Sequence, residues 1–278
     1  MGKVAVDTFY PTKRSNYGVF VIHTSKITQM SLVAALVKNE EYRFLASALE
    51  MWNQFADKIV IVDDGSTDHT VEICTVYGAI VYHRGDQEAA WGAEAPARAF
   101  LWEMALKHSK PGEFITILDA DMVPARSPAE LFKFAGDTVA FRLFDLWAED
   151  SHGTLYYRED SYWQGHNFHR PWAVRRPDAE PAEGWLWPAR GVHCGHFPSN
   201  LPMQRVFYAP VEYSLLHYAY ITPELREAKA AQYASVAAQL SPTERAHAAS
   251  ILDPHPPLFQ VPLTAELTLS MERTPDDN

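Results

Sequence analysis

The sequence has little cysteine and no long hydrophobic run, and both absences exclude classes of protein. Its two cysteines, Cys74 and Cys194, lie far apart and form no C-x-x-C pair, so neither a disulfide framework nor a zinc finger is indicated. No apolar run approaches the ~18 residues that cross a bilayer, and residues 1–30 lack a signal-peptide pattern. We therefore expect a cytoplasmic protein without a transmembrane segment, docked at most peripherally on a membrane.

Basic residues and phosphate-binding loops are also scarce. The 24 basic residues are outnumbered by 35 acidic ones, and the net charge of -11 disfavours a surface that binds duplex nucleic acid through its phosphates. No G-x-x-x-x-G-K-[ST] loop is present, which argues against a Walker-type nucleoside triphosphatase. With 47% hydrophobic residues in 278, the chain can build one substantial core, and we expect one compact catalytic domain.

From residue 31 to residue 144, short apolar runs alternate with helix-like segments. This pattern predicts strands at 32–37, 58–62, 79–82, 114–118 and 138–143, and helices at 41–55, 68–77, 94–108 and 128–134. Strict alternation implies a mostly parallel sheet with helices on both faces, whose ligands bind beyond the carboxyl ends of the strands. Residues 145–220 are irregular and aromatic-rich, and Thr222 with Pro223 opens a helix that we expect to reach about Leu240.

Two acidic motifs stand at the ends of predicted strands. VDDGSTD at 62–68 is explained in part as a strand-to-helix turn, because Gly65 permits a positive φ and Ser, Thr and Asp cap helices. That interpretation does not explain Asp63 and Asp64, since adjacent carboxylates repel each other unless a ligand or cation binds them. In ITILDADMVP at 115–124, Asp119 and Asp121 would point the same way on an extended strand and converge on one cation. Their alternative is a structural role as loop caps.

These motifs resemble those of the family 2 glycosyltransferases of GT-A fold. The matching runs are VAALVKNEE, IVIVDDGSTD and ITILDADMVP, followed by the weaker FDLWAED, YYREDSYW, VHCGHFPSN and LLHYAYITPELREAKAAQY, and together they cover most of 31–253. The resemblance implies an α/β, Rossmann-like sheet flanked by helices, with an irregular acceptor-side region and a C-terminal helix. It also implies an enzyme that transfers a sugar from a nucleotide-diphosphate sugar to an acceptor hydroxyl with inversion, using Mg²⁺ or Mn²⁺.

Carried over residue by residue, the resemblance assigns roles at the donor site. Asp64, and less directly Asp63, would contact the base or ribose. Asp119 and Asp121 would hold the metal against the diphosphate, which gains negative charge as it leaves. His217 is where such enzymes place a third metal or diphosphate contact, and an ordinary packed histidine is the equal alternative. Further expected nucleotide contacts are Lys229 and Arg98, and Tyr233 is another candidate. Ala99 follows Arg98 where the family usually has an asparagine. We interpret Arg226 as an exposed helix charge.

An inverting transfer needs one carboxylate to take the proton from the acceptor hydroxyl. Asp160, between aromatic residues that would raise its pKa toward neutrality, is our first candidate, and Asp145, directly after a strand, is the second. A salt bridge, for example to Arg158, is the structural alternative. Aromatic residues of the same region either stack on sugar rings or fill a core: Trp163, Trp172, Trp185, Trp187, Tyr208 and Tyr213. The spacing of HCGH at 193–196 does not suit zinc, so we interpret it as structural or acceptor-lining.

We therefore divide the chain into an N-terminal extension (1–30), a nucleotide-sugar-binding half (31–144), an acceptor-side half with the C-terminal helix of the same domain (145–252) and a proline-rich, extended tail (253–278). Two other functions stay open. A sugar-phosphate nucleotidyltransferase would carry a Gly-rich basic loop where VKNEE stands. A non-catalytic carbohydrate-binding protein would leave the acidic motifs idle. The sequence does not identify the acceptor, which could be a glycan, a lipid-linked glycan, a protein, a small molecule or a modified nucleobase.

Overall fold

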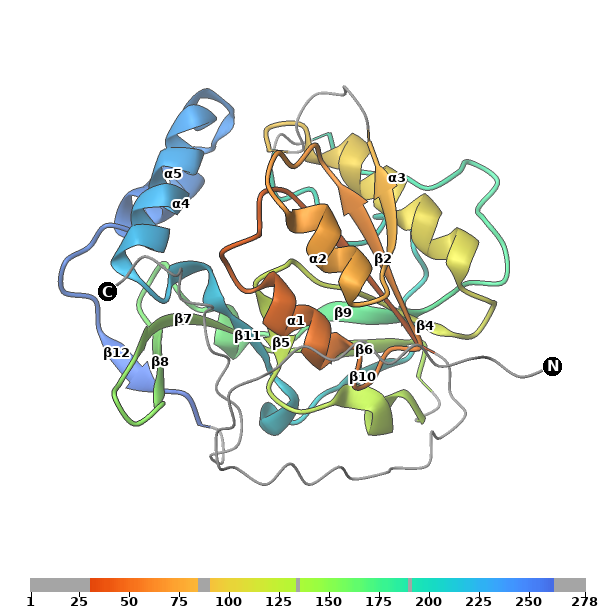
Figure 1. Cartoon of the computed structure of the whole chain (residues 1–278), viewed down its shortest axis with the longest axis horizontal. Helices are drawn as coiled ribbons and strands as arrows, with labels where there is room; N and C mark the ends of the chain where they lie inside the picture. Colours follow the sequence, from red (N-terminus) through yellow and green to blue (C-terminus); the bar gives the residue numbers. More distant parts are fainter. Residues whose placement is uncertain (1–30, 85–90, 134–135, 190–191, 263–278) are drawn as a thin grey trace.

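The computed structural model describes residues 31–84, 91–133, 136–189 and 192–262 (Figure 1). Its strands are β1 (Ser31–Val37), β2 (Lys58–Asp63), β3 (Ile80–His83), β4 (Phe114–Ile117), β5 (Met122–Pro124), β6 (Thr138–Phe141), β7 (Leu143–Glu149), β8 (Leu155–Arg158), β9 (Arg170–Arg175), β10 (Val206–Tyr208), β11 (Leu215–His217) and β12 (Leu258–Gln260). Its α-helices are α1 (Leu45–Trp52), α2 (Thr70–Val76), α3 (Glu94–His108), α4 (Pro223–Ser235) and α5 (Pro242–Ser250). The expected N-terminal extension and most of the proline-rich tail lie outside the described residues.

Seven strands form a central sheet in the order β10-β6-β9-β4-β1-β2-β3. β1 pairs in parallel with β2 and β4, β2 with β3, and β6 with β10. β9 is antiparallel to both of its neighbours, β4 and β6. The predicted α/β fold with a mostly parallel sheet is thus confirmed, and it contains one reversed strand from the irregular half of the chain.

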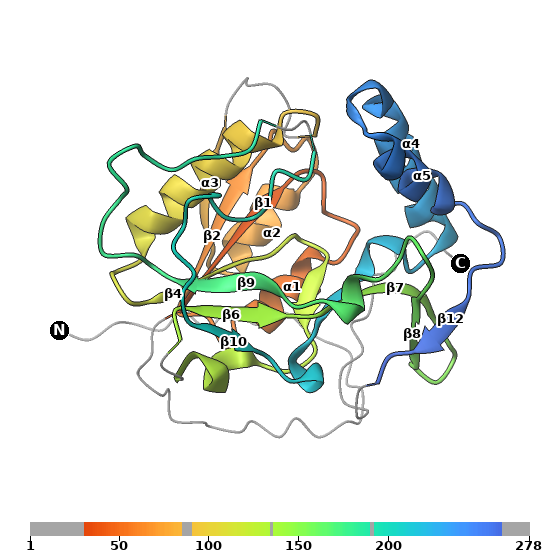
Figure 2. The same cartoon turned by 180° about the vertical axis from the view of Figure 1, so that it is seen from behind.

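Helices cover both faces of this sheet (Figures 1 and 2). α1 and α2 lie on one face, where Trp52 is buried in the same cluster as Val33 of β1. α3 lies on the other face, where Trp102 is buried with Leu32. Successive side chains of β1 thus enter two different cores, which explains why LVAALV at 32–37 is apolar throughout rather than alternating. The two cores hold the carboxyl ends of β1, β2 and β4 in place.

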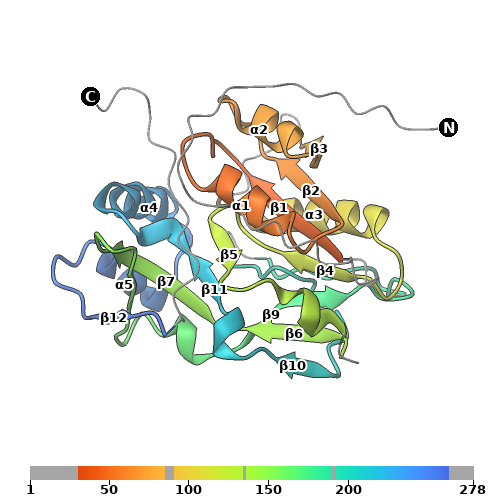
Figure 3. The ribbon, with the colours of Figure 1, turned by 60° about the horizontal axis from the view of Figure 1, so that its bottom comes forward.

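A smaller sheet, in the order β12-β8-β7-β11-β5, extends the fold toward the C-terminal helices. Figure 3 shows β7, β11 and β5 between the central sheet and α4. β11 pairs in parallel with β7 and antiparallel with β5. β5 follows β4 through residues 118–121. The turn that carries Asp119 and Asp121 therefore joins the two sheets.

The ends of several elements differ from the prediction. α1 is shorter than 41–55 because 41–44 form turns, and the helix expected at 128–134 is a 3-10 helix at Pro128–Lys133. α4 is capped by Thr222 as expected and ends at Ser235, before the predicted end. A second helix, α5, follows it and opens with a capping box between Ser241 and Glu244, an S-x-x-E signal present in the sequence.

Two further findings concern the C-terminal part and the membrane. Leu258–Gln260, which we expected to be part of an extended tail, forms β12 against β8. Across 31–84, 91–133, 136–189 and 192–262, no helix has the length and apolar character needed to cross a membrane.

A buried arginine fastens α5 to the smaller sheet. Arg158, at the end of β8, is 3% exposed, and its guanidinium carbon lies 4.9 Å from the ring centre of Trp147. Its Nε donates to Oδ2 of Asp160 at 2.6 Å, and its Nη1 donates to the carbonyl of Ser250, the last residue of α5, at 2.6 Å. Because these partners come from β7, the segment after β8 and α5, the single side chain holds three segments together.

We predict that Arg158→Met destabilises the protein. Methionine retains the apolar stem but leaves Asp160 without its counter-charge, and loss of one partner of such a buried pair should lower the free energy of unfolding by about 3 kcal/mol in urea denaturation. Arg205→Met is the control, because the Arg205 side chain is 70% exposed. A loss as small for Arg158→Met as for this control would contradict the proposed role.

Candidate functional site

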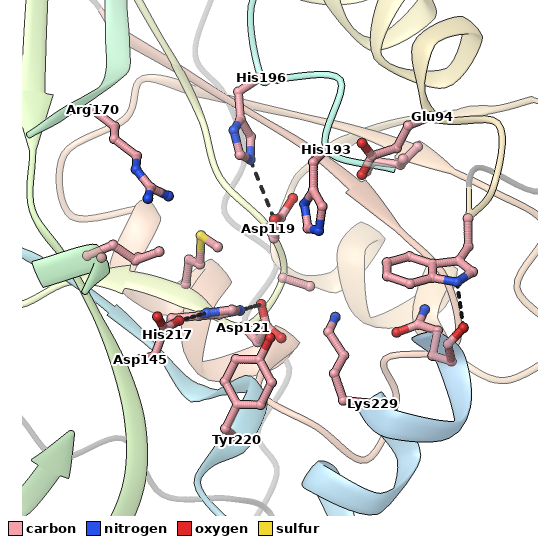
Figure 4. A pocket seen from close by; sticks show the side chains of 18 of the residues that line it. Glu94, Asp119, Asp121, Asp145, Arg170, His193, His196, His217, Tyr220 and Lys229 are labelled. Atoms are coloured by element: carbon pink, nitrogen blue, oxygen red, sulfur yellow. Dashed lines mark hydrogen bonds and ion pairs between the residues drawn. The ribbon is translucent and has the colours of Figure 1, made fainter. Parts of the chain in front are cut away.

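The carboxyl ends of β1, β2 and β4, the smaller sheet and α4 enclose a cavity of about 660 Å³ (Figure 4). Its charged and imidazole-bearing lining residues are Lys38, Glu40, Arg43, Asp64, Glu94, Arg98, Asp119, Asp121, Asp145, Arg170, His193, His196, His217, Lys229 and His247. Its aromatic lining residues are Trp91, Tyr162, Trp163, Phe168, Trp172, Tyr220 and Tyr233. The cavity lies where the sequence predicted a ligand to bind, beyond the ends of the parallel strands.

Asp119 and Asp121 lie in a turn and not on an extended strand. β4 ends at Ile117, β5 begins at Met122, and the Met122 N–H donates to the Asp119 carbonyl at 3.0 Å. The expectation that both carboxylates project from one face of a strand is therefore wrong. The turn gives the two side chains different partners, although both line the cavity.

Asp119 is held by α3 and by the loop that carries His196. Nη2 of Arg98 donates to Oδ1 of Asp119 at 3.0 Å, and Nε2 of His196 lies 3.5 Å from Oδ2. Burial would raise the pKa of Asp119, but the charge of Arg98 and the interaction with His196 hold that pKa well below its usual range. Burial and the charge of Arg98 lower the pKa of His196. Near neutral pH, Asp119 is thus a carboxylate beside an uncharged imidazole.

His217 stands between two carboxylates. In the smaller sheet its register partners are Asp145 on β7 and Met122 on β5. Its Nδ1 lies 2.7 Å from Oδ1 of Asp145, and its Nε2 lies 3.5 Å from Oδ1 of Asp121 (Figure 4). Burial would lower the pKa of His217, but the charge of Asp121 and the hydrogen bond with Asp145 raise it. The Asp145 contact leaves Nε2 as the nitrogen that faces Asp121.

This donor set fits a divalent cation that is shared with a phosphate ligand. A ligating histidine usually has its second nitrogen bound to a carboxylate, as His217 has with Asp145. Within the part of the chain that the structure describes, no group of three or more His, Cys, Asp or Glu residues is placed to hold a metal ion unaided. Mg²⁺ is typically held by one or two carboxylates together with substrate phosphates and waters. Asp121 and His217 could therefore hold it together with a diphosphate, and the expected participation of Asp119 stays a prediction.

Asp63 and Asp64 have different surroundings despite being adjacent. Oδ2 of Asp63 accepts the Gly65 N–H at 3.2 Å, so this carboxylate shapes the turn, in which Gly65 has φ +83°, and it is not among the cavity-lining residues. Asp64 lines the cavity and pairs with the buried Arg84 and with Nζ of Lys38 at 3.9 Å. The repulsion expected from the sequence is therefore relieved by the protein itself, without a ligand.

α4 brings two of the expected nucleotide contacts to the cavity. Lys229 lines it, with Nζ 5.3 Å from the ring centre of Trp91, and Tyr233 lines it, with its hydroxyl 3.1 Å from Nε2 of His193. Arg226 does not line it. Its side chain is half-buried and its Nη1 donates to two backbone carbonyls at 2.9 and 2.7 Å, so Arg226 has a structural role and the expectation of an exposed helix charge is wrong.

The two candidates for the base are placed differently. Asp160 is not among the cavity-lining residues, and its Oδ2 is occupied by Arg158 while its Oδ1 accepts the Tyr162 N–H at 2.8 Å. Asp145 lines the cavity, and its Oδ2 lies beside Gly165, where an added Cβ would be 3.4 Å away. Which of them acts as base stays a prediction, but these positions favour Asp145. Also outside the lining are Glu149, Asp150 and Glu159.

The segment that contains HCGH bridges several parts of the site. His193 has φ +57°, the left-handed region that is uncommon for a residue with a side chain, and the Cys194 N–H donates to Oε2 of Glu94 at 2.9 Å. His193 and His196 line the cavity, as an acceptor-lining interpretation requires. Of the aromatic candidates, Trp163 and Trp172 line it, whereas four do not: Trp185, Trp187, Tyr208 and Tyr213. Lining residues that no motif indicated include Trp91, Arg170 and His247.

Glu40, in the run VKNEE, is a buried acid on the cavity wall. Nη1 of Arg43 donates to its Oε1 at 3.1 Å, and among the described residues its Oε2 has no hydrogen-bond partner. Burial, only partly offset by the charge of Arg43, raises the pKa of Glu40 to about 8. At neutral pH this side chain is therefore mostly protonated in the ligand-free protein.

We predict a pH-dependent gain in stability for Glu40→Gln. The unfolded chain releases the Glu40 proton near pH 4.5 and the folded protein releases it near pH 8, so the stability of the wild type falls as pH rises through this window. Glutamine removes this dependence, and the variant should gain about 2–4 kcal/mol over the wild type between pH 4.5 and pH 8. Urea denaturation of the metal-free proteins at several pH values measures it. A difference that stays constant with pH would show that Glu40 ionises normally.

Residues 37–137 match the family model described as Glycosyl transferase family 2, and no curated protein matches the chain. Among similar solved structures is glucosyl-3-phosphoglycerate synthase from Mycobacterium tuberculosis with Mn²⁺, uridine diphosphate and glucosyl-3-phosphoglycerate: 21% identity, TM-score 0.31, covering 49% of this chain and 50% of that chain. The same synthase with Mn²⁺ and uridine-diphosphate-glucose shows 22% identity and TM-score 0.30, covering 42% and 44%. The matched part thus spans half or less of those chains, a likeness too low to transfer a function. The family match encloses both acidic motifs, and this chain therefore contains a glycosyl transferase family 2 domain.

Proposed function

We propose that this chain is a metal-dependent, inverting glycosyltransferase that moves a sugar from a nucleoside diphosphate sugar to an acceptor hydroxyl. The observation that carries the proposal is the approach of His217, oriented by Asp145, to Asp121 within the family 2 segment. Neither of the two alternative functions explains this arrangement. A carbohydrate-binding protein needs no buried histidine between two carboxylates. A nucleotidyltransferase needs a basic loop where Glu40 stands.

Different residues around the cavity would contact different parts of the donor. Asp64, paired with Lys38 and Arg84, lies at the end of β2 and would contact the nucleoside. Asp121 and His217 would hold Mg²⁺ or Mn²⁺, which when bound neutralises the charge that develops on the leaving diphosphate. Lys229 would add a second positive charge beside the diphosphate.

Asp119 has a separate task in this arrangement. Arg98 fixes one of its oxygens and keeps it ionised, so the carboxylate keeps one orientation before any ligand arrives. A group fixed in this way needs no reorganisation during the reaction. We assign Asp119 to the boundary between the diphosphate and the donor sugar, where it can accept a hydroxyl hydrogen bond or contact the cation.

We place the general base at Asp145. Its Oδ1 orients His217, and its Oδ2 is the oxygen that the missing side chain of Gly165 leaves room to reach. Asp160 is our second candidate, because Arg158 already neutralises it. A base at Asp145 would take the acceptor proton on the same wall of the cavity that holds the proposed cation.

We predict that one of UDP, GDP and dTDP binds, and that binding requires Mn²⁺. His217→Gln and Asp121→Asn should each weaken Mn²⁺-dependent binding by about 10–100-fold or more, since each removes a direct ligand. His69→Gln is the control, because the His69 side chain is 71% exposed and outside the cavity. Isothermal titration with and without Mn²⁺ measures the affinities.

Other outcomes would contradict the proposal. Metal-independent binding would refute the roles of Asp121 and His217. Indifference to all three nucleotides, together with binding of free sugars, would favour a carbohydrate-binding protein. Release of pyrophosphate from a nucleoside triphosphate and a sugar phosphate would favour a nucleotidyltransferase.

We further predict that Asp145→Asn abolishes turnover and Asp160→Asn does not. Slow hydrolysis of the donor serves as the assay, and loss of a general base should cost about 10²–10⁴-fold. The assay is run at saturating Mn²⁺ to separate the base from the orienting role: if excess Mn²⁺ restores Asp145→Asn, this carboxylate only orients His217. The first sugar released should have the inverted anomeric configuration by ¹H NMR before mutarotation. Retention of configuration would overturn the inverting assignment.

A further inference from the structure

Most cations of the cavity are already neutralised by carboxylates. The paired ones are Lys38 with Asp64, Arg43 with Asp121, and Arg98 with Asp119 and Glu94. Of the remaining two, Lys229 lies over the Trp91 ring and belongs to the proposed diphosphate site. The side chain of Arg170 has neither an ion pair nor a hydrogen bond to any residue that the structure describes, and Figure 4 shows its guanidinium directed into the cavity. Because this side chain is exposed and no carboxylate neutralises it, it is free to meet an anionic ligand that enters from solvent.

The strand that carries Arg170 runs against its neighbours. β9 is antiparallel to β4, so its first residues lie at the edge of the sheet where β4 ends and where ligands bind. Its pairing with β6 is irregular, because Ala173 pairs with Val139 and Pro171 pairs with Ala140. Trp172 is therefore the extra residue of a β-bulge. Bulges re-aim side chains and are common beside active sites.

The bulge brings consecutive residues to the cavity. Arg170, Pro171 and Trp172 all line it, which regular alternation of a strand would not allow. Trp172 is 3% exposed, and within the described residues its indole Nε1 has no hydrogen-bond partner. An indole N–H is a donor only, and a buried donor left unpaired is unusual. The ring of His196 packs against Trp172 at 4.2 Å between ring centres.

Arg170 lies at the exposed side of the cavity and not at its nucleoside end. Its chain neighbour Phe168 is 55% exposed, Tyr162 is 46% exposed, and both line the cavity. Asp64, at the end of β2, is by contrast 8% exposed. A ligand that reaches Arg170 thus enters from solvent across aromatic surface, as an acceptor must.

We infer that Arg170, with Trp172 beside it on the bulge, forms an anion-binding subsite for a carboxylate or phosphate group of the acceptor. The acceptor class is then a hydroxyl compound that carries a negative charge, with Phe168 and Tyr162 offering faces to its apolar side. The identification of the bound molecule as the acceptor rests on the proposed function. The anion site itself rests only on the geometry. An arginine suits it because its planar fork binds two oxygens of a carboxylate or phosphate together.

Inorganic sulfate is the probe for the anion site, and it is titrated at constant ionic strength. Mn²⁺ and the nucleotide that binds best are present at saturating concentration, so that sulfate cannot bind to the cations of the proposed diphosphate site. The readout is the indole N–H resonance of Trp172 in a ¹H–¹⁵N spectrum, which is assigned by its disappearance in Trp172→Phe. We expect sulfate to shift this resonance. Arg170→Gln should weaken sulfate binding by about tenfold, because it removes a charge-assisted contact. The affinity of Arg170→Lys for sulfate should lie between those of the wild type and Arg170→Gln.

Arg205→Gln is the matched control, since this arginine is 70% exposed and pairs with Asp137 outside the cavity. It should bind sulfate as the wild type does. An unchanged affinity in Arg170→Gln, or no shift of the Trp172 resonance in the wild type, would overturn the inference. Because Arg170 is exposed, its variants should fold, and unchanged nucleotide binding verifies this.

Two further arms separate the sources of the anion. Glucose 6-phosphate should displace sulfate from the site, as followed by the Trp172 resonance, and glucose should not. This result would support an anionic acceptor. If Arg170→Gln instead weakens UDP-glucuronate and spares UDP-glucose, the anion belongs to the donor sugar and the acceptor assignment is wrong. If no nucleotide binds at all, the proposed function fails, while the sulfate titration without nucleotide still decides whether the anion site exists.

Discussion

The register of one short strand decides the geometry of the site. β11 is hydrogen-bonded in parallel to β7 and antiparallel to β5, which puts His217 opposite Asp145 on one side and beside the end of the acidic turn on the other. The Tyr218 N–H continues this pairing by donating to the carbonyl of Asp121 at 2.9 Å. A slip of one residue would turn the imidazole to the other face of the sheet. The approach of His217 to Asp121 is thus fixed by backbone hydrogen bonds and not by the side chains alone.

Two acids of the cavity are oriented by basic side chains of the protein itself. Arg98 fixes Asp119, and Arg84 with Lys38 fixes Asp64, so these carboxylates are positioned before a ligand binds. Fixed charges of this kind stabilise a developing charge without reorganisation. Glu40 is the exception, because burial outweighs its arginine partner and its pKa is raised to about 8. The site thus combines carboxylates that are paired with basic side chains and one acid, Glu40, whose pKa is raised.

The sequence located the part of the cavity beyond β1, β2 and β4 well because that part obeys local rules. Apolar runs located β1, β2 and α3, and the acids after the strands located the cavity. The same rules failed within the turn, where an extended strand was assumed for Asp119 and Asp121. Adjacent acids were also misjudged: spacing does not reveal that Asp63 shapes the turn at Gly65 while Asp64 pairs with an arginine twenty residues away. Partners distant in sequence are set by tertiary packing, which local patterns do not record.

The other half of the cavity was harder to predict because its residues enter from a reversed strand and from loops. The rule that ligands bind beyond the carboxyl ends of strands applies to β1, β2 and β4, but an antiparallel strand brings its amino end to that same edge. Arg170 therefore reaches the cavity from the start of β9, and a single bulge adds Trp172 to the same wall. Neither feature has a motif, since any sequence can begin a strand and a bulge has no fixed composition. One part of the cavity is thus recognisable from short local runs of sequence. The other part depends on strand direction and register, and only the folded chain brings its residues together.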